Sequence, residues 1–140
     1  MRLHKHLLAS LALAAAILAV GAIAAFASSP LKITNCNSAR SRPKSVTLTC
    51  GDGNTVLKGL KWSSFGGASA QAKGTFTIDL CEPNCAEGKA ASFPVTVKAS
   101  SPRNCKGGLR VYNKLTLAFK GKSPKTEGNL TRWTLGCPIA

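Results

Sequence analysis

The side chains that most often act as catalytic groups are scarce in this sequence of 140 residues. Its two histidines, His4 and His6, lie at the amino terminus, so the later chain cannot build a Ser-His-Asp or Cys-His site. The whole supply of carboxylates is Asp52, Asp79, Glu82, Glu87 and Glu127. A glycosidase can work with two carboxylates, but so short a chain leaves little room for a substrate cleft. We therefore expect no enzyme and no catalytic residue.

Asp52 and Asn54 stand together in a Gly-Asp-Gly-Asn sequence that is typical of a turn. We expect the Asp52 carboxylate to accept hydrogen bonds from nearby backbone amides, as aspartate commonly does in turns. The alternative is a calcium loop, which needs more oxygen ligands than these two side chains supply. The pattern therefore predicts neither a metal nor a cofactor.

The six cysteines predict three disulfides, because small exported domains commonly use disulfides to supplement a modest core. Fifteen pairings are possible. Only three residues separate Cys81 from Cys85, so a bridge between them fits across the intervening turn. The other two pairs, favoured because they are near in sequence or pin the chain ends, are Cys36 with Cys50 and Cys105 with Cys137. A zinc site is the alternative, and it would have to be all-cysteine at unusual spacing.

Residues 1–27 have the three parts of a secretory signal. A basic head precedes an apolar stretch from Leu7 to Ala25, and small residues then lead to a cleavage site between Ala27 and Ser28. The apolar stretch, about 19 residues, could also span a bilayer, so an uncleaved anchor is the alternative. We expect a signal helix that is cleaved, and a secreted protein that leaves the membrane after cleavage.

The remaining chain is strongly basic. The sequence holds 19 Lys and Arg against 5 acids, and two of the basic residues precede residue 28, which leaves a net charge of +12. Such an excess attracts anionic polymers. No aromatic ladder accompanies the charge, so specific nucleic-acid binding is not expected.

Four residues of one parity between positions 109 and 120 predict a basic ribbon: Arg110, Tyr112, Lys114 and Lys120. On an extended strand they would project together over roughly 33 Å, a length that suits an anionic envelope polymer. The alternative is a solvated outer face that keeps the protein soluble and protects a sheet edge.

Short runs with a period of two predict strands throughout the chain after residue 27, and no helical stripe is convincing. The runs lie near 31–34, 46–50, 60–62, 75–80, 93–99, 109–119 and 133–137. About seven strands predict an all-β fold, an antiparallel β-sandwich of immunoglobulin-like architecture, with a small barrel as the alternative. The spacing of Cys50 and Trp62 resembles that of immunoglobulin strands B and C, although the strand-F Tyr-x-Cys is missing.

The chain has room for one compact domain, which we place at residues 46–140 and expect to be monomeric. Residues 28–45 precede it as a basic segment. Within that segment Ser38 to Lys44 is either a flexible arm or a loop held by a bridge between Cys36 and Cys50.

Two cysteine elements resemble those of a family of small secreted actinobacterial proteins. They are Cys-Gly-Asp-Gly-Asn at 50–54 and Cys-x-Pro-x-Cys-Ala-x-Gly at 81–88, and matching stretches cover most of residues 43–120. Where the family has Trp-Gly after Trp-Ser-Ser, this chain has Phe65-Gly66. The family has no assigned activity, so the resemblance implies export from a bacterium and supplies no catalytic residue.

The sequence thus leads to two hypotheses of function. The first is a secreted, non-enzymatic protein that associates with anionic polymers of the cell envelope. The second is a secreted inhibitor that presents the loop between Cys81 and Cys85 to an extracellular enzyme, because a loop closed by a disulfide is already ordered before it binds.

Overall fold

The computed structural model describes residues 29–126 and 128–139. All regular elements in these residues are β-strands except one short 3₁₀ turn, η1 (Lys106–Gly108), so the all-β prediction is confirmed. The predicted signal helix and its cleavage site lie outside the described residues. Within the described part, none of the elements is a helix long and apolar enough to cross a membrane.

Eight strands form a single sheet in the order β2-β1-β7-β6-β5-β4-β3, and β8 pairs with the middle of β7. Their bounds are β1 (Leu31–Asn35), β2 (Ser38–Arg40), β3 (Val46–Thr47), β4 (Thr55–Ser64), β5 (Ser69–Asp79), β6 (Ala90–Asn104), β7 (Arg110–Phe119) and β8 (Arg132–Thr134). Each predicted run overlaps one of these strands, although the runs 46–50 and 133–137 share only two residues each with β3 and β8, and β2 was not predicted. The pair β1–β7 is parallel and the other pairs are antiparallel.

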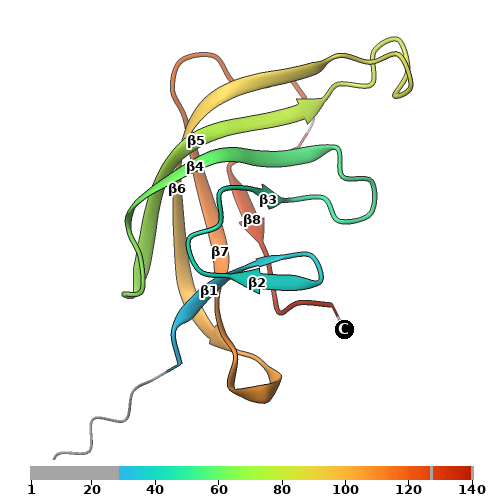
Figure 1. The fold of residues 1–140 in the computed structure, drawn as a ribbon. Helices are drawn as coiled ribbons and strands as arrows, with labels where there is room; N and C mark the ends of the chain where they lie inside the picture. Colours follow the sequence, from blue (N-terminus) through green and yellow to red (C-terminus); the bar gives the residue numbers. More distant parts are fainter. Residues whose placement is uncertain (1–28, 127, 140) are drawn as a thin grey trace, which may run out of the picture.

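The sheet curls along its longest strand, β6, which pairs with β5 on one edge and with β7 on the other. Its residues up to Ser100 pair with β5, and its residues from Val95 onward pair with β7. Ser101 has a φ of 56°, in the left-handed region that interrupts a regular strand. Figure 1 shows β6 following β5 at its start and then bending down beside β7. The result is half of a barrel.

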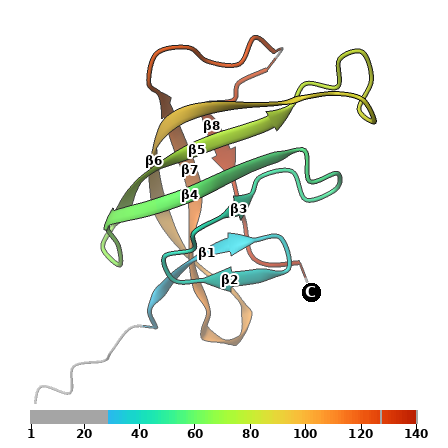
Figure 2. The ribbon, with the colours of Figure 1, turned by 45° about the horizontal axis from the view of Figure 1, so that its top comes forward.

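Side chains and a disulfide join the two ends of the curled sheet. The amide of Thr47 in β3 donates a hydrogen bond to the Asn35 side-chain oxygen in β1, at 2.8 Å. The Cys36–Cys50 disulfide lies beside this contact, and Figure 2 shows β1 and β2 next to β3.

This arrangement corrects two expectations. The described strands form one mixed sheet, so the two stacked antiparallel sheets of the predicted sandwich are not present among them. Cys50 bonds to Cys36 and does not bridge two layers as an immunoglobulin cysteine does. Strands β1 and β2, which lie within residues 28–45, belong to the same sheet as the later strands.

The core fills the concave side of the sheet through rows of cross-strand neighbours. Ala72, Val97 and Leu117 form one such row, and all three are buried. At one end Phe76 meets Phe119 edge-on, with ring centroids 5.3 Å apart. Leu60 and Trp62 both pack on this core, as their shared face predicts.

The three disulfides join the predicted pairs: Cys36–Cys50, Cys81–Cys85 and Cys105–Cys137. The described residues contain no free cysteine. Cys105–Cys137 fixes the carboxyl-terminal segment to the turn after β6, and the Ile139 amide donates to the Cys36 carbonyl at 3.2 Å. Ser38 to Lys44 is therefore held and not a free arm: its first three residues form β2, and the Pro43 carbonyl accepts a hydrogen bond from the Trp62 indole at 2.9 Å.

Candidate functional site

Tyr112 does not belong to an exposed ribbon. Its side chain is fully buried in the core, where its hydroxyl accepts from the Gly66 amide at 3.0 Å and donates to the Gly67 carbonyl at 2.8 Å. The alternation breaks between Tyr112 and Leu115, two buried residues of opposite parity, at the level where Ser101 bends β6. In the sequence, this break is indicated by Asn113, a polar residue at a position where the alternation predicts an apolar one.

The structure consequently separates the four residues predicted to form the ribbon. Arg110 is half-buried beside β1, with which its strand pairs, and lines a small cavity there. Lys114 and Lys120 are exposed on the convex side of the sheet. The four side chains therefore do not line up along one strand. Lys114 and Lys120 belong instead to a different group of cations.

That grouping is a set of seven exposed cations on the convex side of β4 to β8, which we call the outer basic face. Its members are Lys58, Lys61, Lys73, Lys98, Lys114, Lys120 and Arg132. Five of them come from strands other than β7, so the face runs across the sheet and not along one strand.

Strand register brings these residues together. Lys61 of β4 lies directly opposite Lys73 of β5. In the next row Lys98 of β6 opposes Thr116 of β7, which in turn opposes Arg132 of β8.

The outer rows complete the face. Lys114 of β7 lies opposite Ser100, one row beyond Lys98. At the other side Lys58 opposes Thr75, and the Pro94 carbonyl accepts a hydrogen bond from the Lys120 amide at 3.0 Å. Strand spacing and rise make the face roughly 20 Å in each direction.

The cations of the outer basic face are close enough for their potentials to add. Directly opposed side chains such as Lys61 and Lys73 have Cβ atoms about 5 Å apart, and diagonal ones such as Lys73 and Lys98 about 7–8 Å. Both separations are below the Debye length of about 8–10 Å in ordinary buffers. The fields of these neighbouring cations therefore reinforce one another.

None of the carboxylates described in the structure lies in these rows. Asp52 lies in the β3–β4 loop, and Asp79, Glu82 and Glu87 lie at or after the end of β5. The β3–β4 loop and the end of β5 adjoin, because the Asp79 amide donates a hydrogen bond to the Asn54 carbonyl at 3.0 Å. These acids therefore lie outside the rows of the outer basic face and do not neutralise its charge there.

The Asp52 carboxylate stabilises the turn in which it lies. Asp52 accepts hydrogen bonds from the Asn54 amide at 3.1 Å and the Asn54 side chain at 3.0 Å, as predicted. The Asn54 amide, together with Thr49 and further bonds, lowers the pKa of the Asp52 carboxyl from its ordinary 3.8.

The described residues contain no group of three or more potential metal ligands.

The loop closed by Cys81–Cys85 connects the end of β5 to the start of β6 and projects from the sheet there (Figure 1). Residues 82–87 are all exposed. The Asn84 side chain accepts from the Ala86 and Glu87 amides, both at 3.0 Å, and donates to the Glu87 carboxylate at 2.7 Å. The loop is therefore ordered by its own bonds.

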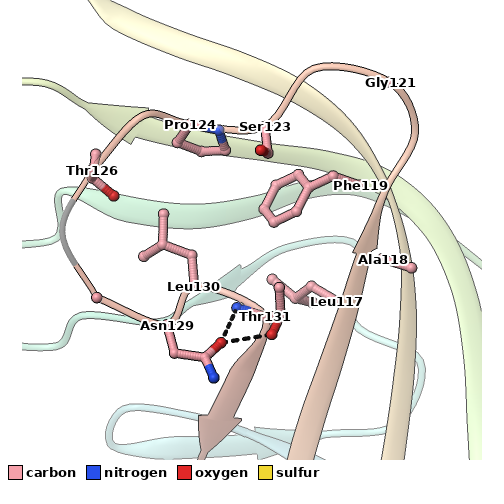
Figure 3. Close-up of a pocket in the computed structure, with 11 residues that line it drawn as sticks. Leu117, Ala118, Phe119, Gly121, Ser123, Pro124, Thr126, Asn129, Leu130 and Thr131 are labelled. Carbon is pink, nitrogen blue, oxygen red and sulfur yellow. Dashed lines mark hydrogen bonds between the residues drawn. The ribbon is translucent and has the colours of Figure 1, made fainter.

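A cavity of about 620 Å³ lies under the connection between β7 and β8. Figure 3 shows the side chains of Leu117, Phe119 and Leu130 pointing into it, and the Asn129 side chain accepting from the Thr131 amide and hydroxyl. The described residues that line it carry no charge. The cavity therefore adds nothing to the outer basic face.

No protein-family model, curated protein sequence or solved structure matches the chain. Its resemblance to secreted actinobacterial proteins stays a prediction.

Proposed function

We propose that this protein is exported and binds anionic polymers of the cell envelope through its outer basic face. The proposal rests on one observation: seven exposed cations occupy adjoining cross-strand rows that contain none of the described acids. Polymers that carry a charge on each repeat replace their counterions with such side chains, and the released ions drive binding.

Export is supported by the disulfides and by the sequence of the amino terminus. Three disulfides are typical of a protein in an oxidising compartment. Cleavage after Ala27 would give a mature chain that begins at Ser28. Amino-terminal sequencing of protein from the culture medium tests this, and a chain that begins at Met1 in the membrane fraction would instead identify an anchor.

Polymer binding is tested with two triple variants of equal charge. Lys61, Lys73 and Lys98 are changed to Gln on the outer basic face, and Lys89, Lys106 and Lys122 are changed to Gln in loops outside it. Retention on immobilised polyphosphate is then measured across a salt gradient. We expect the face variant to elute at clearly lower salt than the loop variant, and the slope of log affinity against log salt to flatten. Equal elution of the two variants would reduce the face to a solvated surface.

An inhibitor is the second candidate function, and the Cys81–Cys85 loop is the feature that favours it. The loop is exposed and ordered in advance, which lowers the entropic cost of docking into an enzyme cleft. Such a complex would survive high salt, unlike contacts through the outer basic face. Changing Asn84 to Ala should then weaken inhibition of an extracellular hydrolase and leave retention on polyphosphate unchanged.

A further inference from the structure

A second basic feature lies away from the outer basic face, where the start of β1, the loop after β2 and the β4–β5 turn meet. It is a cavity of about 350 Å³ whose walls include Arg42, Arg110 and Phe65. Ser29 and Ser41 also line it, and none of its described lining residues is acidic. None of the seven cations of the outer basic face belongs to it.

A chain of aromatic contacts positions Arg42 at this cavity. Its guanidinium carbon lies 6.0 Å from the centre of the Phe65 ring, within the range of a cation–π interaction. The Phe65 ring stands edge-on to Trp62 at 5.0 Å and to Tyr112 at 5.6 Å. Because the Tyr112 hydroxyl also bonds both Gly66 and Gly67, the turn that carries Phe65 is fixed to the core.

The backbone of Arg42 has a φ of 48°, a left-handed value that residues other than glycine seldom adopt. Such values concentrate at functional sites, where the surrounding fold holds the residue in place.

Arg110 supplies a second guanidinium from β7. Its Nη1 donates to the Ser29 carbonyl at 3.4 Å, and a guanidinium has five N–H donors in all. Two arginines in a wall that includes two serines and no acidic residue match the oxygens of a phosphate or a carboxylate, which arginine binds in a bidentate manner.

We propose that Arg42 and Arg110 form a discrete site for one oxyanion group, a phosphate or a carboxylate, carried by a small molecule or by the end of a polymer. This site differs from the outer basic face in kind, because it depends on directed hydrogen bonds and a shaped cavity, whereas the face depends on summed charge. It therefore remains a binding site whether or not the face binds polymers.

The test is titration of the exported chain with inorganic phosphate and, separately, with acetate in 150 mM NaCl, followed by amide chemical shifts. We expect the Gly66 and Ser41 amides to shift with saturation, while the Lys73 and Lys98 amides stay in place. Saturation by phosphate at lower concentration than acetate would identify a phosphoryl ligand, and the reverse order a carboxylate ligand; either result supports the site.

Variants assign the effect to the two arginines. Arg42→Gln and Arg110→Gln should each weaken binding at least tenfold, whereas Arg40→Gln, an exposed neighbour outside the cavity, should change it less than twofold. Phe65→Leu should weaken binding by less than Arg42→Gln, since it removes only the support of the guanidinium. The proposal is overturned if neither anion saturates the wild-type shifts, or if Arg40→Gln weakens binding as much as Arg42→Gln. Retention on polyphosphate is recorded for each variant, so that a failure of the cavity and a failure of the outer basic face remain distinguishable.

Discussion

Lys61 of β4 and Lys73 of β5 lie directly opposite each other on the exposed side of the sheet. Like charges in this position destabilise a strand pair. A chain selected for stability alone would place an acid at one of the two positions. Substitutions at this pair can therefore test whether the charges that favour polymer binding also lower the stability of the fold.

Changing Lys73 to Glu should raise the free energy of unfolding and weaken polymer binding together. Replacing repulsion by attraction across the pair is expected to stabilise the protein by about 0.2–1 kcal/mol in low salt. Urea denaturation and retention on polyphosphate measure the two effects. Lys89→Glu, which makes the same charge change in a loop, is the control and should leave stability nearly unchanged. A Lys73→Glu protein that is no more stable than this control would contradict the cross-strand repulsion.

Gly74 is required because β4 and β5 approach closely at the bulge near Gly59. A Cβ atom at position 74 would lie 2.8 Å from both the Leu60 Cδ2 atom and the Lys58 carbonyl oxygen. Gly74→Ala should therefore destabilise the protein by about 1–3 kcal/mol, the usual cost of overpacking. Gly51→Ala is the matched control, because no atom lies within 4 Å of its added Cβ. Thermal unfolding of both variants tests this, and equal midpoints would show that the sheet adjusts freely.

The disulfides should contribute unequally to stability. Cys105–Cys137 spans 32 residues and Cys81–Cys85 spans four, so the longer bridge restricts the unfolded chain more. Loop-closure entropy predicts losses of about 4 and about 2 kcal/mol when each pair is replaced by serine. Denaturant titration of the two double variants measures the difference. If loss of the short bridge costs more, native-state contacts of its loop outweigh the entropy of the unfolded chain.

The carboxyl of Asp52 should titrate below 3.8, because hydrogen bonds, chiefly from the Asn54 amide, favour its charged form. A pKa that is lower in the folded state than in the unfolded state contributes stability above the unfolded pKa. That contribution is lost as the pH falls through the lowered value. Carboxyl chemical shifts give the titration midpoint directly. In Asp52→Asn, the loss of stability relative to the wild type should shrink as the pH is brought below 3.8, and a constant difference would contradict the assignment.

Local patterns in the sequence predicted most of the strands and the disulfide between nearby cysteines. Alternation places side chains on opposite sides of an extended chain wherever its partners lie, so Leu60 and Trp62 could be assigned to one face in advance. Cysteines near in sequence, such as Cys81 and Cys85, could be paired because few residues separate them. The basic excess likewise follows from composition.

Only the tertiary structure decided which strands are neighbours, because pairing joins residues distant in sequence and leaves no local periodicity. The parallel pairing of β1 with β7 places β1 and β2 in the same sheet as the later strands, where a sandwich was expected. Because of the bend at Ser101 and the break in alternation after Tyr112, the Tyr112 side chain is buried in the core. Register alone places Lys61 against Lys73, and folding alone brings Arg42 to the same cavity as Arg110. Each of these relationships depends on contacts between separate segments, which the order of residues along one strand does not specify.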